Sequence, residues 1–390
     1  MNKIPTKKSG FNPNWQIKTL NEVCDKISAG GDKPYNCTTE KIEENQIPIF
    51  SNGIKNKGLC GYTKTPTITK PALTISARGT IGFACVRYEP FFPIVRLICV
   101  IPNEKLVVLE FLCYALQYII PQGEGTSVPQ LTIPNFKKIK IPIPPLDEQK
   151  RIASALSKID AYLENTIKLI EEKERFKRGI AKKLLTCKEG ENIPEARFKG
   201  FEDEWKIVKL KDMFDNFKEK NNEDKIILAS TIDKGVIPNS LTERKIIRKK
   251  ESLSNYKLVK KGCFVISLMS FQSGFEYSDY EGIISPAYSV LKPKIEMAHY
   301  FYKYYFKSFK FIKDLRPYAE GIRHGKQIKF KACKDILVPY PSIEEQEKIG
   351  GYLSLLDAEI DNLKKQKELI KEMKRGAIQK LLSGEVRLLE

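Results

Sequence analysis

The sequence has few of the residues that build metal sites, and it lacks the long apolar runs that cross membranes. Its only histidines are His299 and His324, and its nine cysteines form no close CxxC pair. A zinc site needs clustered ligands, so we expect no metal site and buried, reduced thiols. The longest apolar run, at 111–120, is far shorter than a membrane span. The basic start lacks the apolar stretch of a signal peptide, so we expect a cytoplasmic protein with no membrane contact.

The usual catalytic motifs are also missing. We find no Walker loop, no carboxylate group typical of a nuclease and no glycine-rich cofactor loop. The tetrapeptide "NPNW" at 12–15 differs at its third position from the Asn-Pro-Pro-aromatic motif of amino-methyltransferases. His324 has no paired nucleophile, which favours a surface role over that of a general base. The sequence therefore predicts no catalytic residue and no cofactor bound by this chain.

What the chain does have is length and positive charge. Its 390 residues, 42% of them hydrophobic, are enough for two or three domains with proper cores. The net charge is +19; segment 147–186 has 10 basic against 7 acidic residues and segment 344–383 has 8 against 8, which leaves +16 elsewhere. A biased composition could produce such an excess. Its concentration in the globular segments favours a nucleic-acid partner, because basic surfaces attract phosphate.

The chain contains a long internal repeat. Pro142 aligns with Pro339, and the alignment continues without a gap to Thr186 and Ser383, with 18 identities in 45 positions. Near its start each copy has a similar motif, "PPLDEQKRI" at 144–152 and "PSIEEQEKI" at 341–349. Each also closes on Lys-Arg-Gly followed by Lys-Leu-Leu. A repeat of this length indicates a duplicated unit.

Both copies have the apolar spacing of a coiled-coil helix. The apolar positions alternate steps of four and three: Ile152, Leu156, Ile159, Leu163, Thr166 and Ile170 in the first copy, and Ile349, Leu353, Leu356, Ile360 and Leu363 in the second. A stripe this long cannot stay exposed, and the nearest partner is the other copy, packed antiparallel. Two separate dimerisation helices are the alternative.

A shorter repeat precedes each helix, with Trp15 matching Trp205 and Leu20 matching Leu210. The module interiors, 30–130 and 220–330, do not align convincingly with each other. Both read as mixed α/β with short strands: the strand-rich stretches 70–101 and 260–293 are each followed by a helical stretch, at 104–120 and 296–315. We predict an α+β protein with two mixed α/β modules, joined and separated by two long antiparallel coiled-coil helices in a pseudo-twofold repeat. The predicted boundaries are 1–146 and 187–343 for the modules, and 147–186 and 344–390 for the helices.

The order of these motifs resembles that of a known family. Besides the paired Trp, Pro-x-Pro…Glu-Gln and Lys-Arg-Gly…Leu-Leu features, the matching segments are "SARGTIG" (76–82), "GTSVPQLTIPNFKKIKIPIPP" (125–145), "RFKGFEDEWKIVKL" (197–210) and "GIISPAYSVLKP" (282–293). With these features the chain resembles the specificity (S) subunit of Type I restriction-modification systems over nearly its whole length.

The resemblance implies a host-defence protein that recognises double-stranded DNA and is not itself a catalyst. Each module would be a target recognition domain for one half of a split sequence, and the helices would act as a spacer and as a docking platform for two methyltransferase (M) subunits. Those subunits would hold S-adenosylmethionine and methylate adenine N6, and motor (R) subunits would complete the restriction complex. Changing the helix length should then change the gap in the target, not the bases read.

Base reading needs polar, basic or aromatic side chains on loops or strands that enter a groove. Two segments of the first module, "SNGIKNKG" and "SARGT", pair hydrogen-bond donors with glycines that allow close backbone approach. For each candidate, a role in a turn or as a solvated charge is an equally good interpretation. The candidates are Ser51, Asn52, Lys55, Ser76, Arg78 and Thr80 in the first module, and Ser270, Gln272, Ser273, Tyr277, Arg323, His324 and Lys326 in the second.

Two other functions stay open on the sequence. A stand-alone DNA methyltransferase or nuclease would bind a cofactor or turn over by itself, and the missing motifs argue against it. A coiled-coil scaffold that binds only protein would need no basic modules, and its DNA binding would not strengthen when partner subunits are added.

Overall fold

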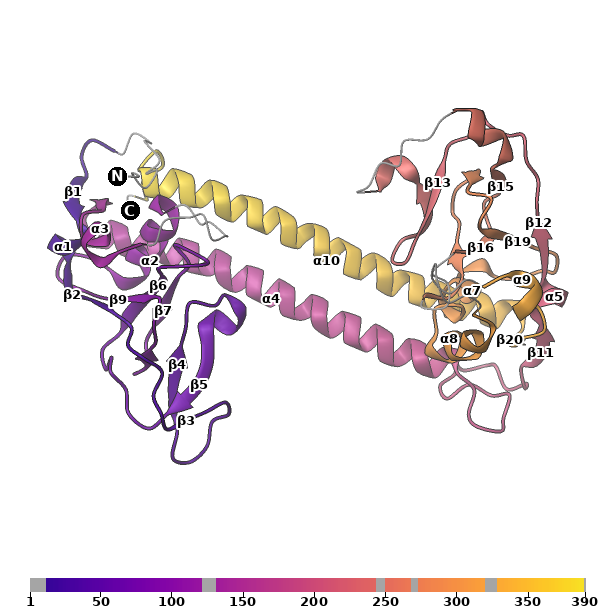
Figure 1. Ribbon diagram of the computed structural model, residues 1–390, viewed down its shortest axis with the longest axis horizontal. Helices are drawn as coiled ribbons and strands as arrows, with labels where there is room; N and C mark the ends of the chain where they lie inside the picture. The colour runs from indigo at the N-terminus through magenta and orange to yellow at the C-terminus, as the bar shows by residue number, and fades with distance from the viewer. Residues whose placement is uncertain (1–11, 121–130, 243–249, 268–272, 320–327, 389–390) are drawn as a thin grey trace. The chain divides into compact units, whose positions relative to one another are not determined.

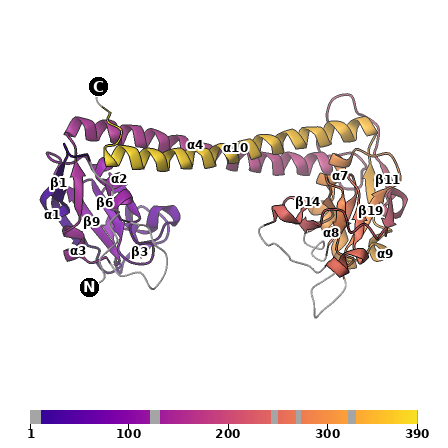
Figure 2. The same cartoon turned by 90° about the horizontal axis from the view of Figure 1, so that it is seen from above.

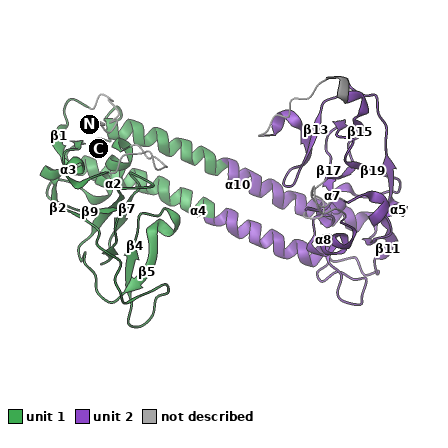
Figure 3. Ribbon diagram, in the orientation of Figure 1, with its two compact units in different colours: residues 1–167, 366–390 green, residues 168–365 purple. Residues whose placement is uncertain are grey.

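The structure is a computed structural model of the 390-residue chain, and it describes residues 12–120, 131–242, 250–267, 273–319 and 328–388. The chain divides into two compact units, which are coloured separately in Figure 3. Unit 1 comprises residues 1–167 and 366–390, and unit 2 comprises residues 168–365. Each unit therefore contains one module and a part of each long helix.

Unit 1 is built on a four-stranded antiparallel sheet of order β2-β9-β6-β7. Strand β6 (Ala72–Ser76) is buried at all five positions, and helix α2 (Leu109–Ile119) contributes seven buried side chains to the same core. The other elements are β1 (Gln16–Thr19), α1 (Leu20–Val23), β2 (Cys24–Ala29), β3 (Cys37–Thr38), β4 (Ile47–Phe50), η1 (Lys55–Gly58), β5 (Leu59–Thr63), β7 (Ala84–Arg87), β8 (Phe92–Pro93), β9 (Leu97–Pro102), α3 (Ile133–Lys137) and β10 (Lys140–Ile143). Strands β1 and β10 pair, and β3-β5-β4-β8 form a second sheet.

Unit 2 is built on a four-stranded sheet of order β12-β19-β16-β17 and has a core rich in aromatic rings. Strands β11 and β20, β13 and β14, and β15 and β18 form two-stranded pairs. The elements are β11 (Lys206–Lys209), α5 (Leu210–Met213), β12 (Phe214–Phe217), β13 (Leu228–Thr231), β14 (Gly235–Pro238), η2 (Asn239–Leu241), η3 (Lys250–Asn255), β15 (Lys257–Val259), β16 (Phe264–Ile266), β17 (Glu276–Tyr277), β18 (Gly282–Ile284), β19 (Ser289–Pro293), α7 (His299–Tyr305), α8 (Phe309–Leu315), η4 (Arg316–Tyr318), α9 (Phe330–Cys333) and β20 (Leu337–Tyr340).

The helical stretch expected at 296–315 is two helices, α7 and α8, and not one. Ser308 causes the break, because its side-chain oxygen accepts a hydrogen bond from the backbone N–H of Phe311 (3.2 Å) and so begins a new helix.

The two modules share a frame that their sequences do not reveal. The sheet β2-β9-β6-β7 corresponds strand for strand to β12-β19-β16-β17, and the pair β1–β10 corresponds to β11–β20. The elements outside this frame differ, since unit 1 has the sheet β3-β5-β4-β8 and unit 2 has two separate strand pairs. The divergence inferred from sequence is therefore confined to side chains and peripheral elements. A sheet keeps its strand order when the alternation of apolar residues and the turn positions are kept, whatever the individual residues are.

The two repeats are long helices, α4 (Leu146–Leu185) and α10 (Ile343–Ser383), and within each unit their segments lie side by side (Figures 1 and 2). In unit 1, Asp160 of α4 pairs with Lys374 of α10 at 2.5 Å. In unit 2, Glu174 pairs with Lys364 at 2.7 Å, and Lys177 pairs with Asp357. Numbers on α10 fall as those on α4 rise, so the helices run antiparallel in unit 2.

The ends of the apolar stripes enter the cores of the modules. Ile152 and Leu156 are part of the core of unit 1, and Ile349 and Leu353 are part of the core of unit 2. The stripes therefore cover not only one another, as expected, but also the modules that precede them. Among the described residues, no helix is both long enough and apolar enough to cross a membrane.

Candidate nucleic-acid interface

The repeated Glu-Gln pair fastens each module to the long helices. In unit 2, Glu345 is 1% exposed and accepts two hydrogen bonds from Arg197, from Nε and from Nη2, both at 2.8 Å. The indole Nε1 of Trp205 donates a third, at 2.9 Å. Three donors around one buried carboxylate offset the cost of removing its charge from water.

Unit 1 has a similar arrangement around Glu148, which is also 1% exposed. Arg387 donates to both of its carboxylate oxygens, at 2.5 and 2.7 Å, and lies 5.9 Å from the centre of the Trp15 ring. The indole N–H of Trp15 is buried and finds no hydrogen-bond partner among the described residues. The matching tryptophans therefore share a position in the fold but not the bond to the carboxylate.

The glutamine of each pair holds the start of a module helix. The side-chain oxygen of Gln149 accepts from the backbone N–H of Val108 at 2.8 Å, and that of Gln346 accepts from the backbone N–H of Ala298 at 3.0 Å. Val108 and Ala298 precede α2 and α7, where backbone N–H groups lack intrahelical partners. The repeated Glu-Gln pair thus positions the module helix, α2 or α7, against the start of the long helix, α4 or α10.

A third fastening joins a module helix to both long helices. In unit 1, the Tyr114 hydroxyl donates to Asp160 at 2.8 Å, and Asp160 pairs with Lys374. Burial, together with the hydrogen bond to Asp160, raises the pKa of Tyr114, so the phenol stays protonated and can donate.

Unit 2 repeats this connection with other residue numbers. The Tyr304 hydroxyl donates to Asp357 at 2.6 Å, and Lys177 pairs with the same carboxylate while lying 5.0 Å from the centre of the Tyr304 ring. Lys177 and Lys374 are the lysines of the two Lys-Arg-Gly segments. The identities in the repeat therefore build the frame of each unit.

Five of the six candidates in unit 1 lie on two loops that bond to each other. Asn52 is the centre of this arrangement: its side-chain amide donates to the backbone oxygen of Arg78 at 2.7 Å. Its own backbone oxygen accepts from the hydroxyls of Ser76 at 3.1 Å and Thr80 at 2.8 Å. The Ser51 hydroxyl donates to a carbonyl of its own loop. The structure thus brings segments 51–58 and 76–80 together.

The candidates in unit 1 differ in what they can offer to a ligand. Ser76 is 1% exposed and its hydroxyl braces the loop. Lys55 and Arg78 are exposed, and neither forms an ion pair within the described part of the chain. Lys57 does, with Glu164 at 3.1 Å. Lys55 and Arg78 are therefore the candidates of this unit with side chains available to DNA.

The glycines of these loops allow the loops to approach each other. Gly58 has φ +86°, and a Cβ on it would lie 2.3 Å from the backbone oxygen of Ser51. Gly79 has φ +81°, and a Cβ there would lie 3.2 Å from the side chain of Asn52. The close approach seen here is between loops, and contact of the glycines with DNA stays a prediction.

In unit 2, five candidates lie outside the described residues: Ser270, Gln272, Arg323, His324 and Lys326. Ser273 and Tyr277 are described and are 5% and 6% exposed. Tyr277 packs in the core of the unit, and burial raises its pKa. Both side chains are nearly buried, which argues against direct base contact by either of them.

Two arginines of unit 1 escaped the sequence analysis. Arg87 is 8% exposed, donates to the Thr74 hydroxyl at 3.1 Å and lies 3.5 Å above the centre of the Phe50 ring, so it stabilises the fold. Arg96 is exposed and has left-handed backbone with φ 73°. The sequence shows an arginine at this position, but no sequence signal indicates its left-handed backbone conformation.

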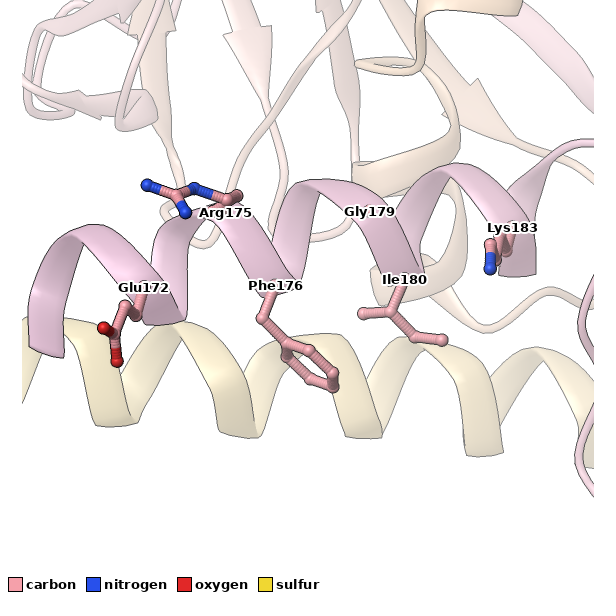
Figure 4. A pocket seen from close by; sticks show the side chains of 6 residues that line it. All are labelled: Glu172, Arg175, Phe176, Gly179, Ile180 and Lys183. Carbon is pink, nitrogen blue, oxygen red and sulfur yellow. The ribbon is translucent and has the colours of Figure 1, made fainter.

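An open groove of about 380 Å³ lies along α4 in unit 2. Its lining includes Phe176, which is 53% exposed, and Gly179. Phe176 and Ile180 lie on the side of α4 nearer α10, whereas Arg175 lies on the other side (Figure 4). In unit 1, Met373 stands at the repeat position of Phe176 and is 50% exposed. The two long helices thus expose an apolar side chain at matching positions of the repeat.

Within the described residues, no three His, Cys, Asp or Glu side chains gather in a way that could hold a metal ion. The nine cysteines are free thiols, four of them buried, and burial raises the pKa of Cys99 and Cys113 to about 12.

The family model for the Type I restriction modification DNA specificity domain matches twice, at residues 12–172 and 202–372. A putative type I restriction enzyme specificity subunit of Methanocaldococcus jannaschii is 26% identical over 96% of this chain and 94% of its own length. A putative type I specificity subunit of Mycoplasma pneumoniae is 36% identical over 38% of this chain, and the match spans 45% of that relative.

Among solved structures, the crystal structure of the Type I restriction-modification system S subunit from M. genitalium has a similar fold. It superposes with a TM-score of 0.61 over 98% of this chain and 99% of that chain, at 19% sequence identity.

Proposed function

Because this chain belongs to the Type I restriction modification DNA specificity family, we propose that it is the DNA-recognition subunit of a Type I restriction-modification complex. Each unit reads one half of a split target on double-stranded DNA, and the chain itself does no chemistry. The observation that carries the proposal is the contrast within the repeat. The fastenings at Glu148 and Glu345 recur in both units, whereas the peripheral elements and loops differ.

The basic charge supports DNA as the partner. The excess of +16 lies outside the stretches 147–186 and 344–383, and therefore mainly on the modules. In unit 1, the exposed Lys55 and Arg78 are not paired with carboxylates in the described residues. Such charges release counterions when they meet phosphates, and arginine also reads guanine edges.

We further propose that two methyltransferase subunits dock on the helix pair, one on each unit. Phe176 in unit 2 and Met373 in unit 1 are half exposed at matching positions of the repeat. Each precedes a glycine, Gly179 or Gly376, where a Cβ would meet nothing within 4 Å, so a partner helix has room to approach. Two similar surfaces fit two copies of one partner.

The remaining roles follow from this assignment. The methyltransferase subunits hold S-adenosylmethionine and transfer its methyl group to adenine N6, motor (R) subunits join to form the restriction complex, and the assembly works in the cytoplasm. The helix pair sets the gap between the half-sites.

Co-expression of the chain with its cognate methyltransferase subunit, followed by genome-wide mapping of N6-methyladenine, tests the proposal. We expect one bipartite motif with a fixed gap. An unmodified genome despite a purified, assembled complex would contradict it. Methylation by this chain alone would indicate a stand-alone enzyme, and an assembly without DNA affinity would indicate a protein scaffold.

A further inference from the structure

Arg96 of unit 1 occupies a backbone conformation that arginine rarely adopts. Its φ is 73°, in the left-handed region, which costs a residue other than glycine about 1 kcal/mol or more. Four such residues occur in the described part of the chain, and three of them, Asn56, Lys57 and Arg96, belong to unit 1. Strain of this kind persists only where the surroundings impose it.

The turn that contains Arg96 is held by segments from several parts of unit 1. It connects β8 to β9 and bonds to the loop after β2, to the end of β4 and to the loop after β6. These contacts fix the backbone at Arg96 and so fix the position and direction of its Cα–Cβ bond. The four backbone hydrogen bonds are Gly30 N to Leu97 O (2.9 Å), Gly31 N to Pro93 O (3.1 Å), Ile94 N to Phe50 O (2.9 Å) and Ala77 N to Arg96 O (2.8 Å).

The last of these bonds places Arg96 beside the candidate loops. The backbone carbonyl of Arg96 accepts a hydrogen bond from the N–H of Ala77, which precedes Arg78. The backbone carbonyl of Arg78 in turn accepts one from the side-chain amide of Asn52. Arg78 and Arg96 are both exposed, and within the described residues neither forms an ion pair. Two like charges thus stand on adjoining loops without a carboxylate to balance them, an arrangement that favours an anionic partner.

The fold itself does not require an arginine at this place. The corresponding strands β9 and β19 both end on a proline, Pro102 and Pro293, and counting back from each matches Arg96 with Ala287. Ala287 is exposed and is not among the residues with left-handed backbone. The position therefore differs between the units in residue and in conformation, as expected of a residue that sets what one unit recognises.

We propose that Arg96 is a specificity-determining residue of unit 1 that reads a guanine in the major groove, next to the position read by Arg78. The inference rests on the proposed function. A guanidinium recognises guanine O6 and N7 through two parallel hydrogen bonds, and such a bidentate contact demands a fixed side-chain origin. An arginine can also bind a phosphate, but a phosphate contact carries no sequence information, so its loss would weaken methylation at all sites alike.

The test uses the full chain co-expressed with its methyltransferase subunit, and Arg96→Gly is the informative variant. Glycine tolerates φ 73°, so the substitution removes the side chain without opposing the turn. The matched control is Lys70→Ala, which removes an exposed positive charge two residues before β6, at the end of that strand opposite to Arg78. The readout is the consensus of methylated sites, which also reports that each variant folds and assembles.

Arg96→Gly should lower the preference for guanine at one position of one half-site by about 10-fold or more. The other positions, the second half-site and the gap should stay as in wild type, and Lys70→Ala should change none of them. An unchanged consensus for Arg96→Gly overturns the inference, as does a uniform loss of methylation at all sites. If wild type yields no bipartite motif, the proposed function fails first, so the two failures are distinguishable.

Discussion

Arg197→Ala should selectively destabilise unit 2. Arg197 forms two hydrogen bonds of 2.8 Å to Glu345, which is 1% exposed. Its removal leaves a carboxylate buried without its cation, and such losses cost about 3 to 5 kcal/mol. Because the Trp205 indole still donates to this carboxylate, we expect the lower end, about 3 kcal/mol.

Hydrogen exchange measured by mass spectrometry is the suitable assay, because it separates the two units within one chain. A loss of about 3 kcal/mol corresponds to protection reduced by about 100-fold. The reduction should appear in β11, in β20 and in the first turns of α10, all of which adjoin Glu345 in the chain or in the sheet. Amides of β6 and β9 in unit 1 should exchange as in wild type.

The control is Lys211→Ala, which breaks a 2.8 Å pair with Asp335 whose two side chains are 42% and 49% exposed. Exposed pairs contribute little, so this variant should leave exchange unchanged. If Arg197→Ala changes the protection of unit 2 by less than about 3-fold, or changes both units equally, the role assigned to Glu345 is wrong.

Three further predictions follow from single contacts. Burial raises the pKa of Glu276 to about 7 despite its ion pair with Lys307, so the folded state holds the carboxyl proton more tightly than the unfolded state does. The free energy of unfolding should therefore fall by about 3 kcal/mol as the pH rises from about 4.5 to about 7. Glu276→Gln should flatten this pH dependence, as measured by urea unfolding at each pH. Gln346→Leu leaves the backbone N–H of Ala298 without its partner and should cost about 1 to 3 kcal/mol in the same assay, whereas a loss below 0.5 kcal/mol would contradict the capping role. Phe176→Ser should leave folding unchanged but weaken binding of the methyltransferase subunit about 10-fold by calorimetry, and equal affinity would place the docking surface elsewhere.

The helices were predictable because their signals are local and repeated. The apolar spacing from Ile152 to Ile170 and the acidic residues after each proline led to helices that the structure has at 146–185 and 343–383. The residues that are identical in the two copies did not reveal which contacts they make. Arg197 lies 12 residues after the end of α4, whereas Arg387 lies four residues after the end of α10, so the partners of Glu148 and Glu345 fall outside the gap-free alignment.

The shared sheet of the modules was not predictable from one sequence. Its strands are two to six residues long, and paired strands such as β2 and β9 lie far apart in the chain. Short strands carry little periodicity, and their pairing is decided by packing. For the same reason, burial of Ser273 and Tyr277 and the left-handed backbone of Arg96 could not be inferred from their residue types.

The central claim is that the repeated parts of the chain set spacing and partners, while the parts between them set the sequence read. Replacing the interior of unit 2, residues 214–336, by the equivalent part of another family member tests this most directly, with Arg197, Trp205, Glu345 and Gln346 retained. Mapping of N6-methyladenine in cells with the cognate methyltransferase subunit gives the result. We expect one new half-site, one unchanged half-site and the same gap; a change in both half-sites, or in the gap, would contradict the central claim.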